Sequence, residues 1–289
     1  MKIVAPTGTA VSRNGGIYKV IGAFAEAGFD GVDITMTNLE EAWLKETKTF
    51  ISEAKRALAD FHIEALQAHA PFPGRRLGDE EYNRRLEPAV LCAMEVAAAL
   101  GVPAIVIHPL HCPKLSAKEQ MAFNMQYYKE LEPVAKSLGI KIAIENMYRS
   151  TGPDHYFPNV CSVPSEHAAY LDELHSDVFI GCIDVGHYAM LGFDPAQVLQ
   201  EMGDHVGALH IHDNNRVHDL HLPPYFAHLN WESILEALAK INYQGHFTFE
   251  THIPSDQPPE LFLAAHKYLA SLGRYMVSRI EYYQSKNKN

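Results

Sequence analysis

The sequence predicts an α/β protein, a (β/α)8 TIM barrel that forms a single domain over residues 1–289. Short β-branched runs alternate eight times with longer amphipathic runs, which is the element count of such a barrel. The runs "AIVI", "IAI" and "FIGCI" are continuously apolar, as parallel strands covered on both faces are. The first turn, "GTAVSRNGG", has no GxGxxG pattern, which disfavours an open doubly wound sheet.

The alternating runs place each element. Strands are expected at residues 2–6, 31–36, 63–70, 104–109, 141–146, 179–184, 206–213 and 246–252. Helices are expected near residues 16–27, 41–60, 80–100, 116–138, 164–173, 195–202, 231–241 and 258–284. Two helix starts carry local signals, because Ser116 with Glu119 fits a capping box and Asp194 before Pro195 fits an N-cap. The tail, from about residue 284 to 289, is expected to fray.

Composition and charge narrow the class of protein. A chain that is 47% hydrophobic and 20% charged is typical of a globular protein, and no apolar run is long enough to cross a membrane. The start "MKIVAPTGTAV" lacks the apolar region of a secretory signal, so we expect a cytoplasmic protein. The four cysteines form no CxxC motif, so neither a disulfide framework nor a thiolate metal site is expected. A net charge of −11 disfavours a nucleic-acid partner.

Six consecutive predicted strands, the third to the eighth, end in residue types that bind metals. The carboxyl ends of barrel strands share one face, where active sites are built, so we expect these side chains to meet at one mouth. In chain order they are His69, His108, Glu145, Asp184 with the nearby His187, His210 and Glu250. The loop after the seventh strand adds Arg216, Asp219 and His221.

A single residue of this kind has a simpler structural explanation. A lone histidine at a strand end is more often part of the core or the surface than a ligand, and Asp213 can cap a turn. His212 and His252 keep such structural interpretations. The coincidence across six strands nevertheless favours a metal centre. Carboxylates with imidazole and no thiolate suit Mn²⁺, Mg²⁺, Co²⁺ or Zn²⁺, and an open coordination position can polarise a substrate oxygen.

The motifs "IEN", "CIDVGH", "HIHDN" and "HLPP", in this order, resemble those of the xylose isomerase-like TIM-barrel superfamily. The resemblance spans nearly the whole chain, from "AHAPFPG" to "FETH". This superfamily contains sugar isomerases and epimerases, and it also contains the endonuclease IV type of abasic-site nuclease. The resemblance therefore implies the barrel fold and two different chemistries.

In the sugar-isomerising branch, the resemblance implies one divalent metal (Mn, Mg, Co or Zn) bound by four residues. These are Glu145, Asp184, His210 and Glu250. It also implies substrate-binding residues, which are His187 and Arg216, with His69 and His108 lining the pocket. A substrate-binding glutamate of the ketohexose 3-epimerases is replaced here by Thr151, which puts that particular reaction in doubt.

In the endonuclease IV branch, the resemblance implies up to three zinc ions, so that further ligands join the four above. The possible additional metal ligands are His69, His108, His187, Asp219 and His221. The net charge of −11, and a loop "FPGRRLGDEEYNRRLEP" that mixes both signs, are poor for binding duplex DNA. The aromatic residues of "HLPPYFAHLNW" can close over a small ligand. These features favour a small sugar-like substrate over nucleic acid.

The expected function is a divalent-metal-dependent isomerase or epimerase of a sugar or sugar-like molecule. Glu145 and Glu250 come from different sides of the mouth and can remove and return a proton beside a carbonyl, through an enediolate. A hydride shift is an equally possible route for aldose–ketose exchange. The alternatives are an endonuclease IV-like zinc phosphodiesterase acting on abasic-site DNA and a non-catalytic metal-dependent binding protein. The aromatic-rich last helix can support a homodimer.

Overall fold

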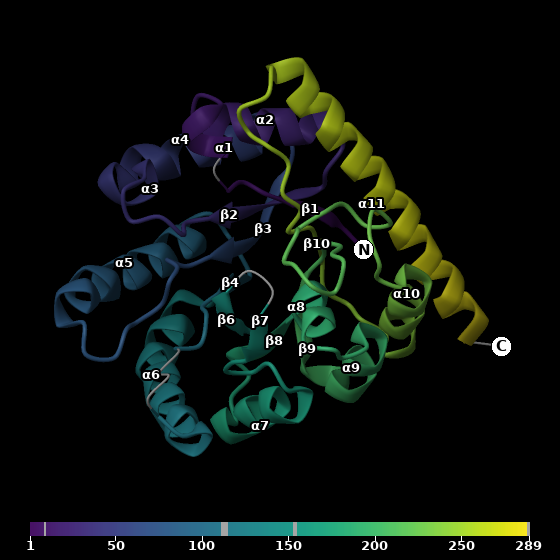
Figure 1. The fold of residues 1–289 in the computed structure, drawn as a ribbon. Helices are drawn as coiled ribbons and strands as arrows, with labels where there is room; N and C mark the ends of the chain where they lie inside the picture. Colours follow the sequence, from purple (N-terminus) through teal and green to yellow (C-terminus); the bar gives the residue numbers. More distant parts are fainter. Residues whose placement is uncertain (9, 111–114, 153–154, 288–289) are drawn as a thin grey trace.

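The computed structural model describes residues 1–8, 10–110, 115–152 and 155–287 and confirms the (β/α)8 barrel (Figure 1). Its parallel strands follow the order β10-β1-β2-β3-β4-β5-β8-β9, and a parallel bridge between Ile211 and Phe249 joins the two ends of the sheet. The barrel strands are β1 (Ile3–Pro6), β2 (Gly31–Thr35), β3 (Glu64–His69), β4 (Ala104–Val106), β5 (Lys141–Glu145), β8 (Phe179–Asp184), β9 (Val206–His210) and β10 (Phe247–Thr248). Each lies within a predicted strand.

Helices surround the sheet (Figure 1). The longer ones are α2 (Ile17–Ala27), α4 (Thr47–Asp60), α5 (Glu80–Ala99), α6 (Ala117–Leu138), α7 (Pro164–Leu174), α9 (Pro195–Met202), α10 (Trp231–Lys240) and α11 (Pro259–Asn287). The shorter ones are α1 (Ala10–Arg13), α3 (Ala42–Lys45), α8 (Val185–Met190) and the 3-10 helix η1 (Gly203–His205). Helix α11 reaches Asn287, inside the tail that was expected to fray, and residues 288–289 lie outside the described part.

Both predicted helix starts have the expected caps. The Ser116 hydroxyl accepts from the Glu119 N–H, and the Glu119 carboxylate accepts from the Ser116 N–H at 2.8 Å. The Asp194 carboxylate accepts from the N–H of Ala196 at 3.0 Å. The predicted helix near 41–60 is divided into α3 and α4, because Glu46 leaves helical geometry with φ −128° and ψ 41°.

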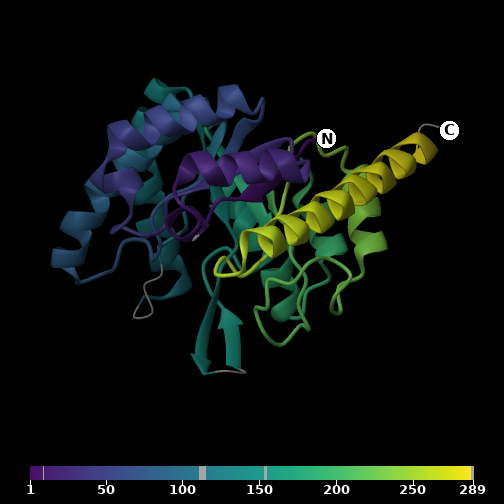
Figure 2. The same ribbon diagram turned by 90° about the horizontal axis from the view of Figure 1, so that it is seen from above.

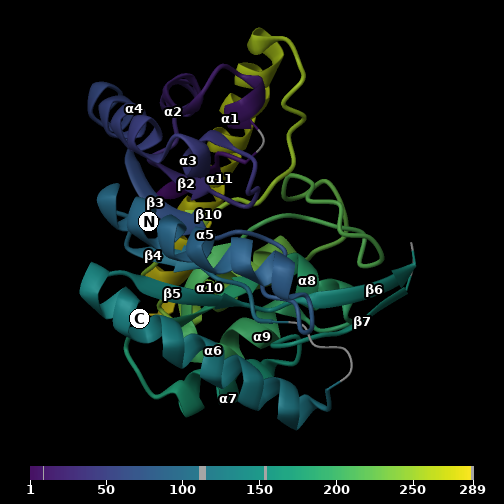
Figure 3. The same ribbon diagram turned by 90° about the vertical axis from the view of Figure 1, so that its left-hand side faces the viewer.

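An antiparallel hairpin follows β5 in a segment where no strand is predicted. It consists of β6 (Tyr148–Gly152) and β7 (His155–Pro158), and it projects from the barrel on the side where β5 ends (Figures 2 and 3). Its short strands are mostly exposed and carry no apolar alternation, so the sequence offers little signal for them. The hairpin nevertheless brings Tyr148 to the barrel mouth.

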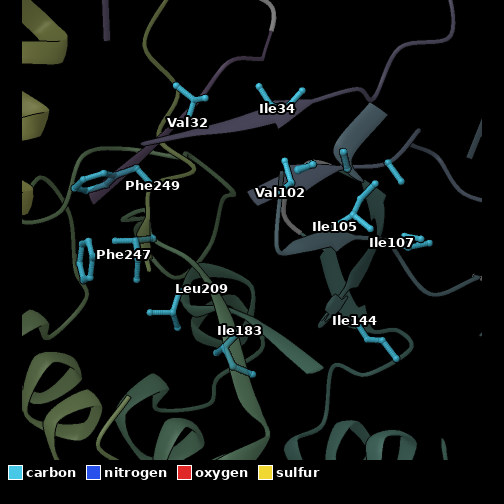
Figure 4. Packing of buried hydrophobic residues seen from close by; sticks show 14 of the residues in the cluster. Val32, Ile34, Val102, Ile105, Ile107, Ile144, Ile183, Leu209, Phe247 and Phe249 are labelled. Atoms are coloured by element: carbon cyan, nitrogen blue, oxygen red, sulfur yellow. The ribbon is translucent and has the colours of Figure 1, made fainter. Parts of the chain in front are cut away.

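Residues along the strands alternate between two environments. Those that face the helices belong to the main hydrophobic core and include Ile105, Ile144, Ile183 and Leu209 (Figure 4). Their neighbours form a small separate cluster, which consists of Val106, Ala143, Cys182 and Ala208. Because side chains alternate along a strand, the residue two positions after each member of this small cluster lies on the same face. Those residues are His108, Glu145, Asp184 and His210.

Two further predictions concern membrane-spanning helices and cysteine chemistry. No helix among them is both long and apolar enough to span a membrane. Cys92, Cys161 and Cys182 are free thiols, and Cys112 lies outside the described residues.

Candidate metal centre

A cavity of about 470 Å³ lies at the carboxyl ends of the strands. Most of the predicted site residues line it, namely His69, His108, Glu145, His187, Asp219, His221 and Glu250. Asp184 and His210 are fully buried directly behind this lining. Arg216 is different, because it is exposed and does not line the cavity. The structure thus brings together all the predicted site residues except Arg216.

Glu145, Asp184, His210 and Glu250 place one ligand atom each within 4.8 Å of one another. The Nδ1 of His210 lies 3.1 Å from a Glu145 oxygen, 3.5 Å from a Glu250 oxygen and 4.0 Å from an Asp184 oxygen. Among the described residues, His210 Nδ1, Glu145 Oε2 and Glu250 Oε2 are buried and have no partner with hydrogen-bond geometry. Three carboxylates crowded around one imidazole are costly to bury without a cation, so this donor set fits a divalent metal.

The two glutamates of this cluster have pKa values displaced in opposite directions. Burial opposes ionisation of Glu145, but the imidazoles of His210 and His108 outweigh it and hold its pKa well below the ordinary range. Burial and the neighbouring charges of Glu145 and Asp184 raise the pKa of Glu250 well above its ordinary range. The opposed shifts show that the metal-free cluster resists holding all of its carboxylates ionised, which a bound cation would relieve.

The Asp184 carboxylate is held in place by its surroundings. It accepts from the N–H of His187 at 2.7 Å, because Asp184 caps helix α8, and it lies 3.0 Å from Nε2 of His212. Asn146 fixes the backbone of Asp184 through two hydrogen bonds, of 2.8 and 3.0 Å. Such contacts behind a metal ligand usually orient it. His212 and Asn146 were not predicted to contribute to the site.

Gly186 in the "DVGH" motif makes room for His212. A Cβ added at Gly186 would lie 2.1 Å from Cε1 of the His212 ring, which no real side chain tolerates. On its other side, the His212 ring stacks on His221 with centroids 4.0 Å apart. The glycine is therefore required by the close approach of His212 to helix α8.

A second group of possible ligands adjoins the first and consists of His187, His212, Asp219 and His221. The Nδ1 of His187 donates to the Asn146 carbonyl at 2.9 Å, and the Nδ1 of His221 donates to the Glu250 carbonyl. Both rings therefore turn Nε2 toward Asp219, at 3.6 and 3.0 Å. Tyr148 donates to the same carboxylate at 3.0 Å.

A third group, which consists of Asp33, His69 and His210, was only partly predicted. Asp33 is fully buried and lies 2.9 Å from Nδ1 of His69, which leaves His69 Nε2 facing the cavity 3.7 Å from Glu250. Gln67 donates to Asp33 at 2.8 Å. The signal that could have revealed Asp33 is its position between Val32 and Ile34, where an unpaired charge would be costly.

Asp213 and His252, for which the sequence favours a structural role, differ in their positions relative to the cavity. The Asp213 carboxylate accepts from the N–H groups of Ala227 and Leu229 and from the Trp231 indole, so it ties down the loop before α10. His252 is exposed at the rim of the cavity. Asp213 thus serves the fold, whereas His252 borders the site.

The chain has relatives among characterised and uncharacterised proteins. It is 27% identical to the 3-dehydro-D-guloside 4-epimerase of Escherichia coli over 252 residues, which are 82% of this chain and 87% of that protein. It is 28% identical to an uncharacterized protein of Sinorhizobium fredii over 197 residues, 66% of this chain but only 54% of that protein. The crystal structure of the D-allulose 3-epimerase from Methylomonas sp. has the same fold, with a TM-score of 0.75, 20% identity, and 97% and 98% of the chains covered.

The family is identified by a match that covers most of the chain. Residues 21–272, which include every residue of the three possible ligand groups, match one family as a single unit. The barrel topology and the ligand groups at the strand ends agree with that match. This chain belongs to the xylose isomerase-like TIM barrel family.

Proposed function

We propose that this protein is a divalent-metal-dependent epimerase or isomerase of a keto sugar. The observation that carries the proposal is the cluster of Glu145, Asp184, His210 and Glu250, in which three carboxylates surround one buried imidazole. Relatives that are sugar epimerases support the substrate class. Because its donors are carboxylates and an imidazole, the site suits Mn²⁺, Mg²⁺, Co²⁺ or Zn²⁺.

Each residue of the site has a role in this proposal. A bound divalent cation supplies a Lewis acid that stabilises negative charge on substrate oxygens. Glu145 and Glu250 exchange protons with the carbon beside the carbonyl, one removing a proton and the other returning it to the opposite face. His69 and His187 line the cavity and hydrogen-bond substrate oxygens. Arg216 remains a substrate-binding residue by family resemblance alone.

The second ligand group bears on the alternative function, which takes additional metal ions. His187 and His221 offer imidazole donors whose orientation is fixed by backbone carbonyls, as that of metal-bound histidines usually is, and Asp219 adds a carboxylate. His69 and His108 are the possible ligands of a third ion, and His108 Nε2 lies 2.9 Å from Glu145. Three zinc ions would favour the alternative function, an endonuclease IV-like phosphodiesterase, and the net charge of −11 disfavours it.

Solvent exchange tests the proposed reaction. The Mn²⁺-loaded protein is incubated in D₂O with a panel of ketohexoses and 3-keto-glucosides, and the products are followed by NMR. We expect one epimer to appear with deuterium at the inverted carbon, because the proton passes through a carboxyl group that exchanges with solvent. A product without deuterium would contradict the two-glutamate route, and cleavage of abasic-site DNA without any sugar turnover would favour the alternative function.

A further inference from the structure

The cavity extends beyond the metal centre to a second end. This far end lies between helix α2, the segment before α11 and the start of α11, and it is lined by Phe24, Ile253, Ser255, Phe262 and His266. Helices α2 and α11 lie side by side there (Figures 1 and 2). Threonines at the ends of β1 and β2, Thr7 and Thr35, also line the cavity. None of the far-end residues belongs to a possible ligand group.

Three aromatic rings form the wall of the far end. The His266 ring lies 4.1 Å from Phe262 and 4.8 Å from Phe24, measured between centroids. Phe24 and Phe262 are stacked at 6.1 Å. All three side chains are at least nine-tenths buried and belong to two helices of the scaffold. The wall is therefore rigid and mainly apolar.

His266 supplies one directed polar atom to this wall. Its Nδ1 donates to the Phe262 carbonyl at 2.7 Å, so Nε2 carries the lone pair of the neutral ring. Burial lowers the pKa of His266, which keeps the ring neutral near pH 7. No hydrogen bond to Nε2 is found among the described residues, and His266 lines the cavity. An acceptor in a cavity wall suits a ligand hydroxyl.

The backbone around the far end is held by a contact between distant segments. The Asn14 side-chain amide donates to the Ser255 carbonyl at 3.3 Å and so joins the loop after α1 to the segment before α11. Ser255 itself is 5% exposed. The far end is thus a built part of the cavity, bounded by two tied segments.

We propose that the far end is a subsite for a second sugar ring, glycosidically joined to the sugar that reacts at the metal centre. A sugar ring has apolar C–H faces, which suit the cavity-lining side chains of Ile253 and Phe262, and hydroxyl edges, one of which donates to His266 Nε2. The cavity volume of about 470 Å³ lies within the range of pockets that enclose ligands of this size. This inference rests on the proposed function, because it names the substrate class of the same cavity.

Calorimetry with matched ligands tests the subsite. The Mn²⁺-loaded protein is titrated with methyl 3-keto-β-D-glucoside and with the disaccharide in which the same 3-keto ring is linked β-1,4 to glucose. We expect the disaccharide to bind about tenfold more tightly, as one well-placed hydrogen bond and the ring contacts provide. In His266→Leu we expect the ratio of the two dissociation constants to fall to about one. The methyl glycoside should bind as in the wild type. His266→Gln, which offers an oxygen near Nε2, restores part of the preference.

The control is Tyr268→Ala, at a side chain on the outer face of the same helix that is 48% exposed. It should keep the full preference for the disaccharide. A wild-type preference near one, with turnover of the methyl glycoside intact, would overturn the subsite and leave the proposed function standing. An unchanged preference in a folded His266→Leu protein would also overturn it. If neither ketone binds while a ketohexose is turned over, the subsite fails and the proposed function stands; if no keto sugar of the panel reacts, both fail.

Discussion

The two ends of the barrel use charged residues in opposite ways. At the amino ends of the strands, Arg274 forms a bidentate ion pair with Asp30 at 2.6 and 2.7 Å, and Lys2 pairs with Glu64. These pairs are partly exposed, and each acid has a cation beside it. At the carboxyl ends, acids and imidazoles are buried together, and no Lys or Arg is among the described residues that line the cavity.

The difference separates stability from function on one scaffold. A surface ion pair contributes little and needs no further partner. The buried cluster around His210 has unmatched oxygen and nitrogen atoms, which is an arrangement that costs stability unless a ligand completes it. The same division, with stability at the amino ends and chemistry at the carboxyl ends, is general for barrels of this class.

Removal of one charge from the cluster should have the largest effect. Glu145→Gln keeps the side-chain size but removes a metal ligand and a proton-exchanging group, so we expect turnover to fall by about 10²–10⁴-fold or more. Glu250→Gln should do the same, and it should also leave the metal-free protein as stable or more stable, because it removes a charge that Glu145 and Asp184 repel. Steady-state kinetics and thermal unfolding measure both effects, and full activity in either variant would refute the two-glutamate scheme.

The addition of one methyl group behind the cluster should have an intermediate effect. Gly186→Ala forces the His212 ring away from Asp184, and loss of such a supporting contact typically lowers metal affinity by about 10–100-fold. Gly152→Ala is the control, because the nearest atom to its added Cβ is 3.8 Å away. Titration with Mn²⁺ gives the affinities, and an unaltered affinity in Gly186→Ala would show that His212 does not orient the ligand.

A change at the amino ends should have the smallest effect. Arg274→Met removes the ion pair to Asp30 but keeps much of the stem, so we expect a loss of about 0.5–1 kcal/mol in the free energy of unfolding and unchanged turnover. Burial raises the pKa of Asp30, but its hydrogen bonds to Arg274 and Ile3 outweigh that and lower it. The contribution is therefore present above about pH 4 and disappears as the pH falls through the folded-state pKa. Denaturant unfolding at several pH values measures this contribution to stability. A changed turnover in Arg274→Met would contradict the separation of stability from function between the two ends of the barrel.

The sequence predicted the barrel because its signals are local and repeated. Strand, turn and helix alternate with clear periodicity, and caps such as Ser116 and Asp194 mark the boundaries. The β6–β7 hairpin was missed because its strands are exposed and have no buried face to leave a pattern. The break at Glu46 was missed because the sequence around it has no Gly or Pro that would mark the end of a helix.

The candidate ligands were predictable for the same reason, since each stands at a strand end and the fold brings strand ends together. The residues that orient these ligands were not predictable. Asp33 lies inside a strand, and His212 is separated from Asp184 by 28 residues. The far end of the cavity could not be predicted from the sequence either. Phe24 and His266 belong to helices at opposite ends of the chain, and only the closed barrel makes them neighbours.

The most direct test of the metal centre is the metal content of the protein. Wild type and Glu145→Gln are purified in parallel without added metal or chelator, and elemental analysis is then repeated after saturation with Mn²⁺ and removal of free ions. We expect about one divalent ion per wild-type chain, bound by Glu145, Asp184, His210 and Glu250. We expect Glu145→Gln to lose most of that ion. Wild-type protein that retains no divalent ion, or that holds three zinc ions and cleaves abasic-site DNA, would contradict this expectation.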